Sequence, residues 1–265
     1  MHTMDAADLL LAYDDQLRGR PEFAGAEHVR RDGPVWTGRF GDANGFISHD
    51  PTWTPADPAE VAVGVDDAVG RLGPDVHEIE WKTRGHDPVI ALLHEALLAR
   101  GFVPDEAESV MIGRTADLAG DVPLPDGVTL RRIATADDVH AMAAMQADAF
   151  GAARPHAADA LGRRLAAGED LAIWVAEHAG HVICAGRIEP VPGTEFAGIW
   201  GGATEKAWRG RGIYRALTAA RARWALARDV TFLQSDSTEA SRPILERSGM
   251  VRVTTTTPYM WRRGT

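Results

Sequence analysis

The stretch from Gly201 to Arg228 constrains the fold most, because a glycine-rich turn stands there between a predicted strand and a predicted helix. The turn, residues 209–212, reads RGRG. Its glycines let several backbone N–H groups converge on one point, and the N-terminus of the following helix adds partial positive charge. Arg209, Arg211 and Arg215 surround the turn. This pattern predicts an anion site that suits a pyrophosphate better than a carboxylate.

The segments on either side of the turn predict a sheet with a helix packed on it. Residues 196–204 form a predicted strand that leads into the turn. The helix after the turn carries apolar residues at alternating spacings of four and three, which gives it one apolar face; these are Ile213, Leu217, Ala220, Trp224 and Ala227. A strand–turn–helix unit of this kind is typical of α/β proteins.

The rest of the C-terminal half continues this alternation. Residues 128–132 predict a strand and 135–150 a helix, with Thr135 as its N-cap. A second helix is predicted over 156–167, and a hairpin over 171–189. After the central helix come a strand over 230–235, a helix over 240–247 and a final strand over 251–261. We therefore expect a mixed sheet flanked by helices.

The first half of the chain predicts a second, related domain. Helices are expected over 6–17 and 58–72, and extended segments over 35–48. The two halves end in the same order of elements: a strand, a polar loop, a proline, a helix, a glycine with a large apolar residue, and a strand. The first half ends in WKTRGHDPVIALLHEALLARGFVPDEAESVMIG, and the second half ends in LQSDSTEASRPILERSGMVRVTTTTPYMWR. Between the halves, residues 116–127 carry prolines, glycines and aspartates without apolar periodicity, which predicts a linker.

Composition excludes several classes of function. The net charge of −10, from 28 basic and 38 acidic residues, argues against a nucleic-acid binder and suits an amine substrate. One cysteine, Cys184, allows no disulfide framework, and the histidines show no metal-ligand spacing, so we expect no metal site. No secretory signal or membrane span is apparent, and we expect a cytoplasmic protein that acts as a monomer or homodimer.

Two segments of the C-terminal half resemble the GNAT (GCN5-related) N-acetyltransferase superfamily. Residues 204–215, TEKAWRGRGIYR, are similar to its cofactor loop, Arg/Gln-x-x-Gly-x-Gly/Ala. Residues 237–250, STEASRPILERSGM, are similar to its later segment, N-x-x-A-x-x-L-Y-E-K-L-G-F. The resemblance covers residues 128–265 with all elements in the expected order, and the end of the first half resembles a degenerate repeat of the same superfamily.

The resemblance implies a fold, a donor and a set of binding residues. It implies an α/β (α+β) tandem of GNAT-like mixed sheets flanked by helices, with a degenerate domain at 1–115, a linker at 116–127 and an acetyltransferase domain at 128–265. Acetyl-CoA is the implied acyl donor, with its thioester between splayed strands. The implied cofactor-binding residues are Ala203, Thr204, Arg209, Gly210, Arg211, Gly212, Ile213, Tyr214, Arg215 and Thr238.

Departures from the family pattern leave the proton-transfer groups open. The family's Gly or Ala falls on Tyr214, whose ring must point away from the phosphates, and its Asn falls on Thr238. The family's frequent general-acid Tyr falls on Leu245, and the glutamate base of its histone-type members falls on Gly198, so both usual groups are missing. Tyr259 and Asp236 are the catalytic candidates that the sequence offers, although burial of the ring explains Tyr259 and helix capping explains Asp236 as well.

Other polar residues are weaker candidates. Glu189 and Glu195 flank the turn before the third strand of the second half, where either could line the substrate side or stay a solvated loop carboxylate. The cluster of Trp81, Lys82, His86 and Asp87 is interpreted as a strand end with a turn fixed by Pro88, with a substrate or interdomain role as the alternative.

The sequence thus predicts an acetyl-CoA-dependent N-acetyltransferase acting on the amine of a small molecule. Two hypotheses from other classes compete with it. A catalytically silent acyl-CoA-binding or regulatory module would explain the missing acid and base. A nucleotide-binding domain is disfavoured, because the chain lacks Gly-Lys-Ser/Thr and a GxGxxG followed by a ribose-binding carboxylate.

Overall fold

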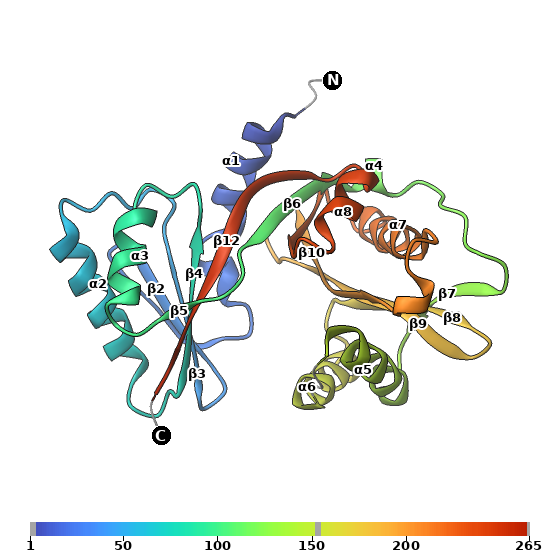
Figure 1. Cartoon of the computed structure of the whole chain (residues 1–265), viewed down its shortest axis with the longest axis horizontal. Helices are drawn as coiled ribbons and strands as arrows, with labels where there is room; N and C mark the ends of the chain where they lie inside the picture. Colours follow the sequence, from blue (N-terminus) through green and yellow to red (C-terminus); the bar gives the residue numbers. More distant parts are fainter. Residues whose placement is uncertain (1–3, 152–154, 264–265) are drawn as a thin grey trace. The chain divides into compact units, whose positions relative to one another are not determined.

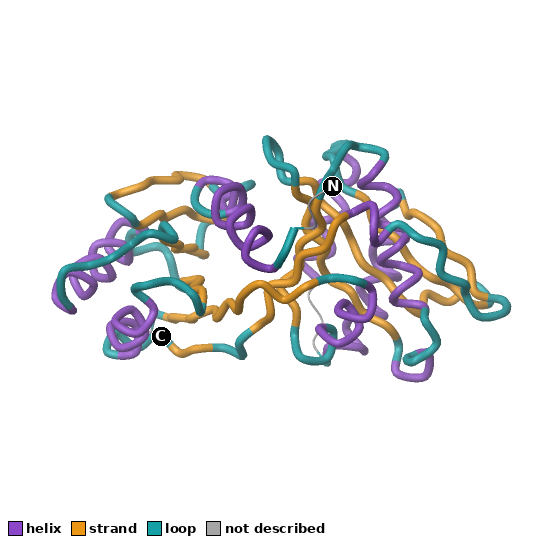
Figure 2. The backbone as a smooth tube through the Cα atoms, turned by 90° about the horizontal axis from the view of Figure 1, so that it is seen from above, coloured by secondary structure: helices purple, strands orange, loops and turns teal. Residues whose placement is uncertain are grey.

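The computed structural model describes residues 4–151 and 155–263, which form two compact units. The first unit comprises residues 1–110, 236–239 and 252–265, and the second comprises residues 111–235 and 240–251. Both units combine strands with helices (Figures 1 and 2). Among the described helices, none combines the length and the apolar character needed to cross a membrane.

The first unit is a mixed sheet with two helices on one face. Its strands β1, β2 and β3 are antiparallel, β3 pairs parallel with β4, and β12 pairs antiparallel with β4. The strands are β1 (Glu27–Asp32), β2 (Val35–Phe40), β3 (Asn44–His49), β4 (Glu78–Arg84), the short β5 (Val103–Pro104), which pairs with β12, and β12 (Val251–Arg262). Its helices are α1 (Ala6–Leu17), the 3-10 turn η1 (Arg20–Phe23), α2 (Pro58–Leu72) and α3 (Ile90–Leu98).

Helices α2 and α3 bury their apolar faces against alternate residues of β4. Val61, Val65 and Leu72 of α2 are buried in the same apolar cluster as Ile79 and Trp81. The opposite face of β4 carries the polar side chains of Glu78, Glu80, Lys82 and Arg84. This alternation sets Glu80, Lys82 and Arg84 on the face of the sheet opposite α2 and α3.

The second unit has a similar order of strands, with one more antiparallel strand before the parallel pair. Strands β7, β8, β9 and β10 are antiparallel, and β10 pairs parallel with β11 through a crossover helix, α7; β6 lies next to β11. The elements are β6 (Glu108–Arg114), α4 (Thr115–Leu118), β7 (Val128–Ile133), α5 (Ala136–Phe150), α6 (Pro155–Ala166), β8 (Ala172–His178), β9 (His181–Pro190), β10 (Phe196–Thr204), η2 (Lys206–Trp208), α7 (Ile213–Leu226), β11 (Phe232–Ser237) and α8 (Arg242–Ser248).

Helices cover both faces of the second sheet. Helix α7 lies on one face, and α5 and α6 lie on the other (Figure 1). Ala222 and Ala225 of α7 share an apolar cluster with Ile199 of β10, whereas Val139 and Met142 of α5 share another with strand residues of β8 and β9. The prediction of mixed sheets flanked by helices is confirmed.

Several local predictions are confirmed and two features differ. The helix predicted over 6–17 is present, and Thr135 caps α5 by accepting a hydrogen bond from the N–H of Asp138. Strand β1 was not predicted, because its sequence EHVRRD is polar and almost wholly exposed and so lacks alternation. The last strand also departs from the expected contiguous division, because residues 252–262 of β12 group with the first unit. The domain boundaries at 115 and 128 stay a prediction.

The pairing of β12 with β4 yields a stability prediction. Thr256 of β12 is fully buried, and its hydroxyl donates a hydrogen bond to the carbonyl of Thr83 at 2.8 Å. Thr256→Val keeps the shape but removes this donor, so we expect the free energy of unfolding to fall by about 1–2 kcal/mol in urea titrations. Thr129→Val, at an exposed position of β7, is the control and should change it by less than about 0.5 kcal/mol. Equal losses in both variants would contradict this role for Thr256.

Candidate active site

The turn between β10 and α7 presents backbone N–H groups that no side chain of the turn satisfies. Gly210 and Gly212 both have positive φ, +76° and +80°, which favours glycine at each position. Gly212 is the N-cap of α7 and makes no side-chain capping bond. The first intrahelical bond runs from the N–H of Ala216 to the carbonyl of Gly212 at 3.0 Å, so the amides of residues 213–215 precede it. These amides and the helix dipole fit an anionic group.

The arginines of the turn do not all point outward as free cations. The Arg209 side chain donates to the carbonyl of Thr204 at 3.0 Å, which ties the turn to the end of β10. Arg211 lies over the Trp208 ring, 4.7 Å from its centroid, and stays exposed. Arg215 is exposed on the first turn of α7. Arg211 and Arg215 are therefore the cations that solvent or an anion can reach most directly.

Tyr214 turns its ring towards β10. A Cβ added to Gly202 would lie 2.5 Å from the Tyr214 hydroxyl oxygen and 2.6 Å from its Cε2. The ring also lies over the buried guanidinium of Arg221, 5.7 Å from Cζ to the centroid. The expectation that the ring of Tyr214 points away from the turn agrees with this packing, and it explains why position 202 is a glycine.

Strand β10 is distorted where the thioester is expected. Its register with β9 shifts between Trp200 and Ala203, and Gly201 has a φ of +62°. Its register with β11 spans three pairs, from Phe196 with Phe232 to Gly198 with Gln234, although β10 runs on to Thr204. Over Ile199–Thr204 the described register gives β10 no partner on the β11 side. Its backbone there suits an added, strand-like ligand.

The two positions expected to carry an acid and a base are occupied by residues that cannot transfer a proton, Leu245 and Gly198. A Cβ at Gly198 would lie 2.4 Å from the indole nitrogen of Trp200, so the space of the family's glutamate is filled by the Trp200 ring. Leu245, at the position of the family's tyrosine, is fully buried in the apolar cluster around α7. Neither position can therefore supply a proton-transfer group.

The remaining carboxylates near β10 are engaged. Glu189 accepts hydrogen bonds from Arg164 and Arg187, and it pairs across the ladder with Gly198. Burial would raise the pKa of Glu189, but the hydrogen bond from Arg164 and the charge of Arg187 bring it below its usual value. Glu195 accepts from the hydroxyl of Thr231 at 3.2 Å. Sequence reasoning missed Arg187, because a single arginine after a buried apolar run gives no periodic signal.

The other predicted site residues lie in the first unit. Asp236 accepts a hydrogen bond from the amine of Lys82 at 2.5 Å, and Tyr259 bonds through its hydroxyl to Nδ1 of His94 at 2.6 Å. Tyr259 is 5% exposed, and burial raises its pKa. Thr238 belongs to the same unit, whereas the glycine turn belongs to the second. The binding role of Thr238 and the catalytic roles of Asp236 and Tyr259 stay predictions.

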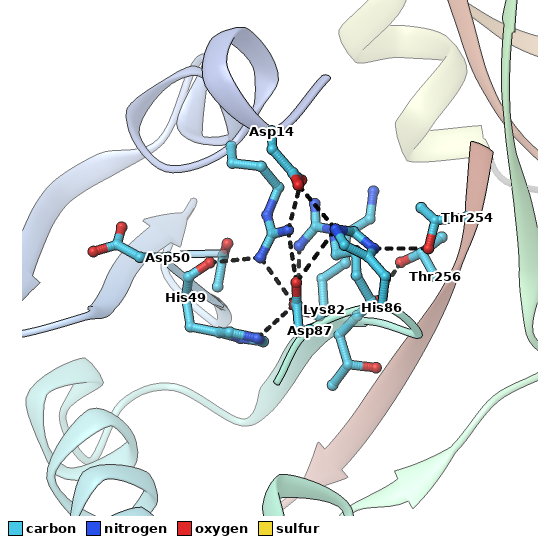
Figure 3. A network of polar contacts seen from close by, with 12 residues as sticks. Asp14, His49, Asp50, Lys82, His86, Asp87, Thr254 and Thr256 are labelled. Carbon is cyan, nitrogen blue, oxygen red and sulfur yellow. Dashed lines mark hydrogen bonds and ion pairs between the residues drawn. The ribbon is translucent and has the colours of Figure 1, made fainter. Parts of the chain in front are cut away.

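The cluster at Trp81–Asp87 extends into a buried polar network (Figure 3). Asp87 accepts from both terminal nitrogens of Arg18, at 3.1 and 3.0 Å, and lies 2.8 Å from Nε2 of His49. His86 bridges Asp14 and the hydroxyl of Thr254. Burial would raise the pKa of Asp87, but His49 and Arg18 lower it to about 2. These contacts fix the residues that follow β4, which agrees with the interpretation of this cluster as the end of a strand and a turn.

The crossover helix of the first unit lacks an open N-terminus. Helix α2 begins at Pro58, which has no N–H, and Asp57 caps it by accepting from the N–H of Glu60 at 3.0 Å. The Glu60 carboxylate then accepts from the N–H of Ala56. These carboxylates occupy the place that an anion would need. Of the two crossover helices, α7 is the one that fits a phosphate.

Two further expectations concern cysteine and metal. Cys184 is fully buried with its Sγ 3.1 Å from the hydroxyl of Thr204, and burial raises its pKa to about 11. Among the described residues, no group of three or more His, Cys, Asp or Glu side chains is arranged to hold a metal ion.

Comparisons with known proteins agree with this geometry. The model of the acetyltransferase (GNAT) family matches residues 139–250. No curated protein matches the chain. Among solved structures, a GCN5-related N-acetyltransferase from Kribbella flavida is 16% identical with a TM-score of 0.68, over 98% of this chain and 95% of its own. One from Sphaerobacter thermophilus is 17% identical with a TM-score of 0.60, over 88% and 78%.

A tandem protein is also similar in fold. The tandem GNAT protein from the clavulanic acid biosynthesis pathway is 14% identical with a TM-score of 0.60, over 89% of this chain and 82% of its own. At such identities the similarity concerns the fold. It extends over both units of this chain.

The Asp87 network predicts a pH-dependent contribution to stability. The pKa of Asp87 is lowered to about 2, so its ion pairs stabilise the fold fully at pH values above 3.8, the ordinary pKa of an aspartate. This contribution is lost as the pH falls towards 2. Asp87→Asn should therefore destabilise the protein strongly at neutral pH, by about 3 kcal/mol or more. The difference from wild type in urea unfolding should shrink by about 1 kcal/mol between pH 5 and pH 3. A difference that is constant or grows over this range would contradict the assignment.

Proposed function

Since residues 139–250 belong to the acetyltransferase (GNAT) family, we propose that this chain transfers the acetyl group of acetyl-CoA to the amine of a small molecule. One observation carries the proposal: the uncapped N-terminus of α7 follows two glycines of positive φ directly after a strand whose far end is open on the β11 side. The second unit thus has free amides for the pyrophosphate next to a free strand edge for the pantetheine arm.

The residues of this unit have distinct roles in the proposal. The amides of Ile213, Tyr214 and Arg215 hold the pyrophosphate, with Arg211 and Arg215 as nearby cations. The backbone of Ala203 and Thr204 aligns the pantetheine arm. Gly210 and Gly212 give the turn its shape, and Arg209 fixes it to Thr204. Binding of this kind places the thioester beside the distorted part of β10.

The transfer is a direct displacement in a ternary complex. The neutral amine nitrogen forms a bond to the acetyl carbon, the carbon–sulfur bond breaks, and one proton of the nitrogen ends on the CoA sulfur. The enzyme contributes proximity, a backbone N–H for the developing oxyanion, and a path for the proton. Asp236 is the proposed proton-transfer residue. Tyr259 is the other candidate, but its hydrogen bond to His94 favours a structural role for its ring.

Binding of acetyl-CoA tests the donor assignment. Gly212→Asp places a side chain at a φ of +80° and a negative charge at the turn, so we expect isothermal titration to show at least a 100-fold loss of affinity, or about 3 kcal/mol. Gly180→Asp, at another positive-φ glycine in the β8–β9 hairpin, is the matched control and should bind as wild type does. No binding by the wild type, or unchanged binding after Gly212→Asp, would refute the assignment.

Turnover separates an enzyme from a silent binding module. CoA thiol release from acetyl-CoA across an amine panel should exceed the background with at least one amine. Tyr259→Phe should lower the free energy of unfolding by about 1 kcal/mol, because His94 loses its partner, and leave kcat unchanged. A fall in kcat of about 100-fold would instead assign Tyr259 as general acid. Binding without turnover of any amine would favour the silent module.

A further inference from the structure

A polar wall lines the β10 sheet on the face opposite α7. It consists of Gln146 of α5, Arg164 of α6, and Arg187 and Glu189 of β9. Arg187 is the direct ladder partner of Trp200, and Glu189 that of Gly198, so these side chains share a face with the Trp200 indole. Gln146 donates to the carbonyl of Gly201 at 2.6 Å. The wall therefore lies at the distorted part of β10, where the proposed thioester comes.

Both carboxylate oxygens of Glu189, the acidic residue of this wall, accept hydrogen bonds from neighbouring arginines. One oxygen of Glu189 accepts from Nε of Arg187 at 2.5 Å, and the other accepts from Arg164 at 2.7 Å. Arg164 is in turn bonded to Glu169 at 2.7 Å. The alternating chain of charges ends at Arg187. Glu189 is thus a support for this arginine, and an ammonium group would have to displace two guanidinium groups to reach it.

Arg187 is held in place, yet part of its guanidinium is open. Its backbone carbonyl accepts from the buried Arg221 at 3.3 Å, and Glu189 fixes its Nε. Its NH1 lies 3.3 Å from the position of a Cβ at Gly201, and 33% of its side chain is exposed. Within residues 4–151 and 155–263, the two terminal nitrogens of Arg187 have no hydrogen-bond acceptor. A fixed guanidinium with open N–H groups matches a carboxylate in geometry and charge.

Gln146 completes the site for such a molecule. Because its amide nitrogen is bonded to Gly201, its side-chain oxygen is left as an acceptor for an N–H group. A molecule with its carboxylate on Arg187 would bring a nearby amine to this oxygen. The positive charge of Arg187 would also disfavour an acceptor that is only cationic.

We propose that the acetyl acceptor is an amine that also carries a carboxylate, as in an amino acid, with its carboxylate on Arg187 and its amine N–H on the side-chain oxygen of Gln146. The proposal rests on the acetyltransferase function proposed above and specifies the class of its acceptor. It assigns Arg187 as the residue that determines this specificity.

Matched pairs of acceptors test the proposal. CoA thiol release from acetyl-CoA is measured with free amino acids and with their α-amides, which keep the amine and lose the negative charge. We expect kcat/KM to favour the acids by about 10- to 100-fold in the wild type. Arg187→Met should abolish this preference through KM for the acids and leave the amides unchanged, and Arg187→Lys should keep part of it. Arg163→Met, at an exposed arginine of α6, is the control and should keep all of it.

The outcomes separate this inference from the proposed function. Equal rates for acids and amides in the wild type, or a preference that survives in Arg187→Met, would overturn carboxylate recognition and leave acetyl transfer in place. If no acid is turned over, and none binds the CoA-loaded protein in saturation-transfer NMR, the inference is also wrong. Acetyl-CoA titration of each variant shows whether the donor site is intact, and if Arg187→Met does not fold, the Arg187→Lys result decides.

Discussion

Parallel pairing of two strands is the constraint on which the proposed site depends. Consecutive parallel neighbours cannot be joined by a hairpin and need a longer crossover connection, usually a helix. In the second unit this helix is α7, and its N-terminus necessarily follows the end of β10. Its first amides need partners, and no capping side chain provides one. In the first unit the same crossover exists, but Asp57 and Pro58 close it.

The two units therefore differ in where their polar groups are satisfied. In the first unit, ion pairs around Asp87 and Arg18 pair these charges with one another, although the Nε of Arg18 is buried without a hydrogen-bond partner among the described residues. Such networks contribute less to net stability than their number suggests, because each charge loses its hydration on burial. In the second unit, backbone amides at the turn and the terminal nitrogens of Arg187 are left open. This contrast agrees with one unit that supports and one that binds.

Much of the second unit could be predicted from sequence, because glycine turns, caps and apolar periodicity act over a few residues. The turn at 209–212 and the Thr135 cap are such local signals. Strand β1 was not predicted, because its side chains are almost all exposed and show no alternation. The grouping of β12 with the first unit was not predicted either, because it depends on pairing between residues far apart in the sequence. Arg187 and Trp200 were missed for a similar reason: their role depends on a ladder register that no local pattern encodes.

The place of β12 in the first unit has a consequence for biosynthesis. Its partner strand β4 ends at Arg84, but the residues that pair with it begin at Thr256, near the end of the chain. A ribosome adding roughly 5–20 residues per second leaves β4 without this neighbour for about ten seconds or longer. During that interval one edge of β4 is an unpaired template for other strands. The first unit to be synthesised is thus the last to be completed.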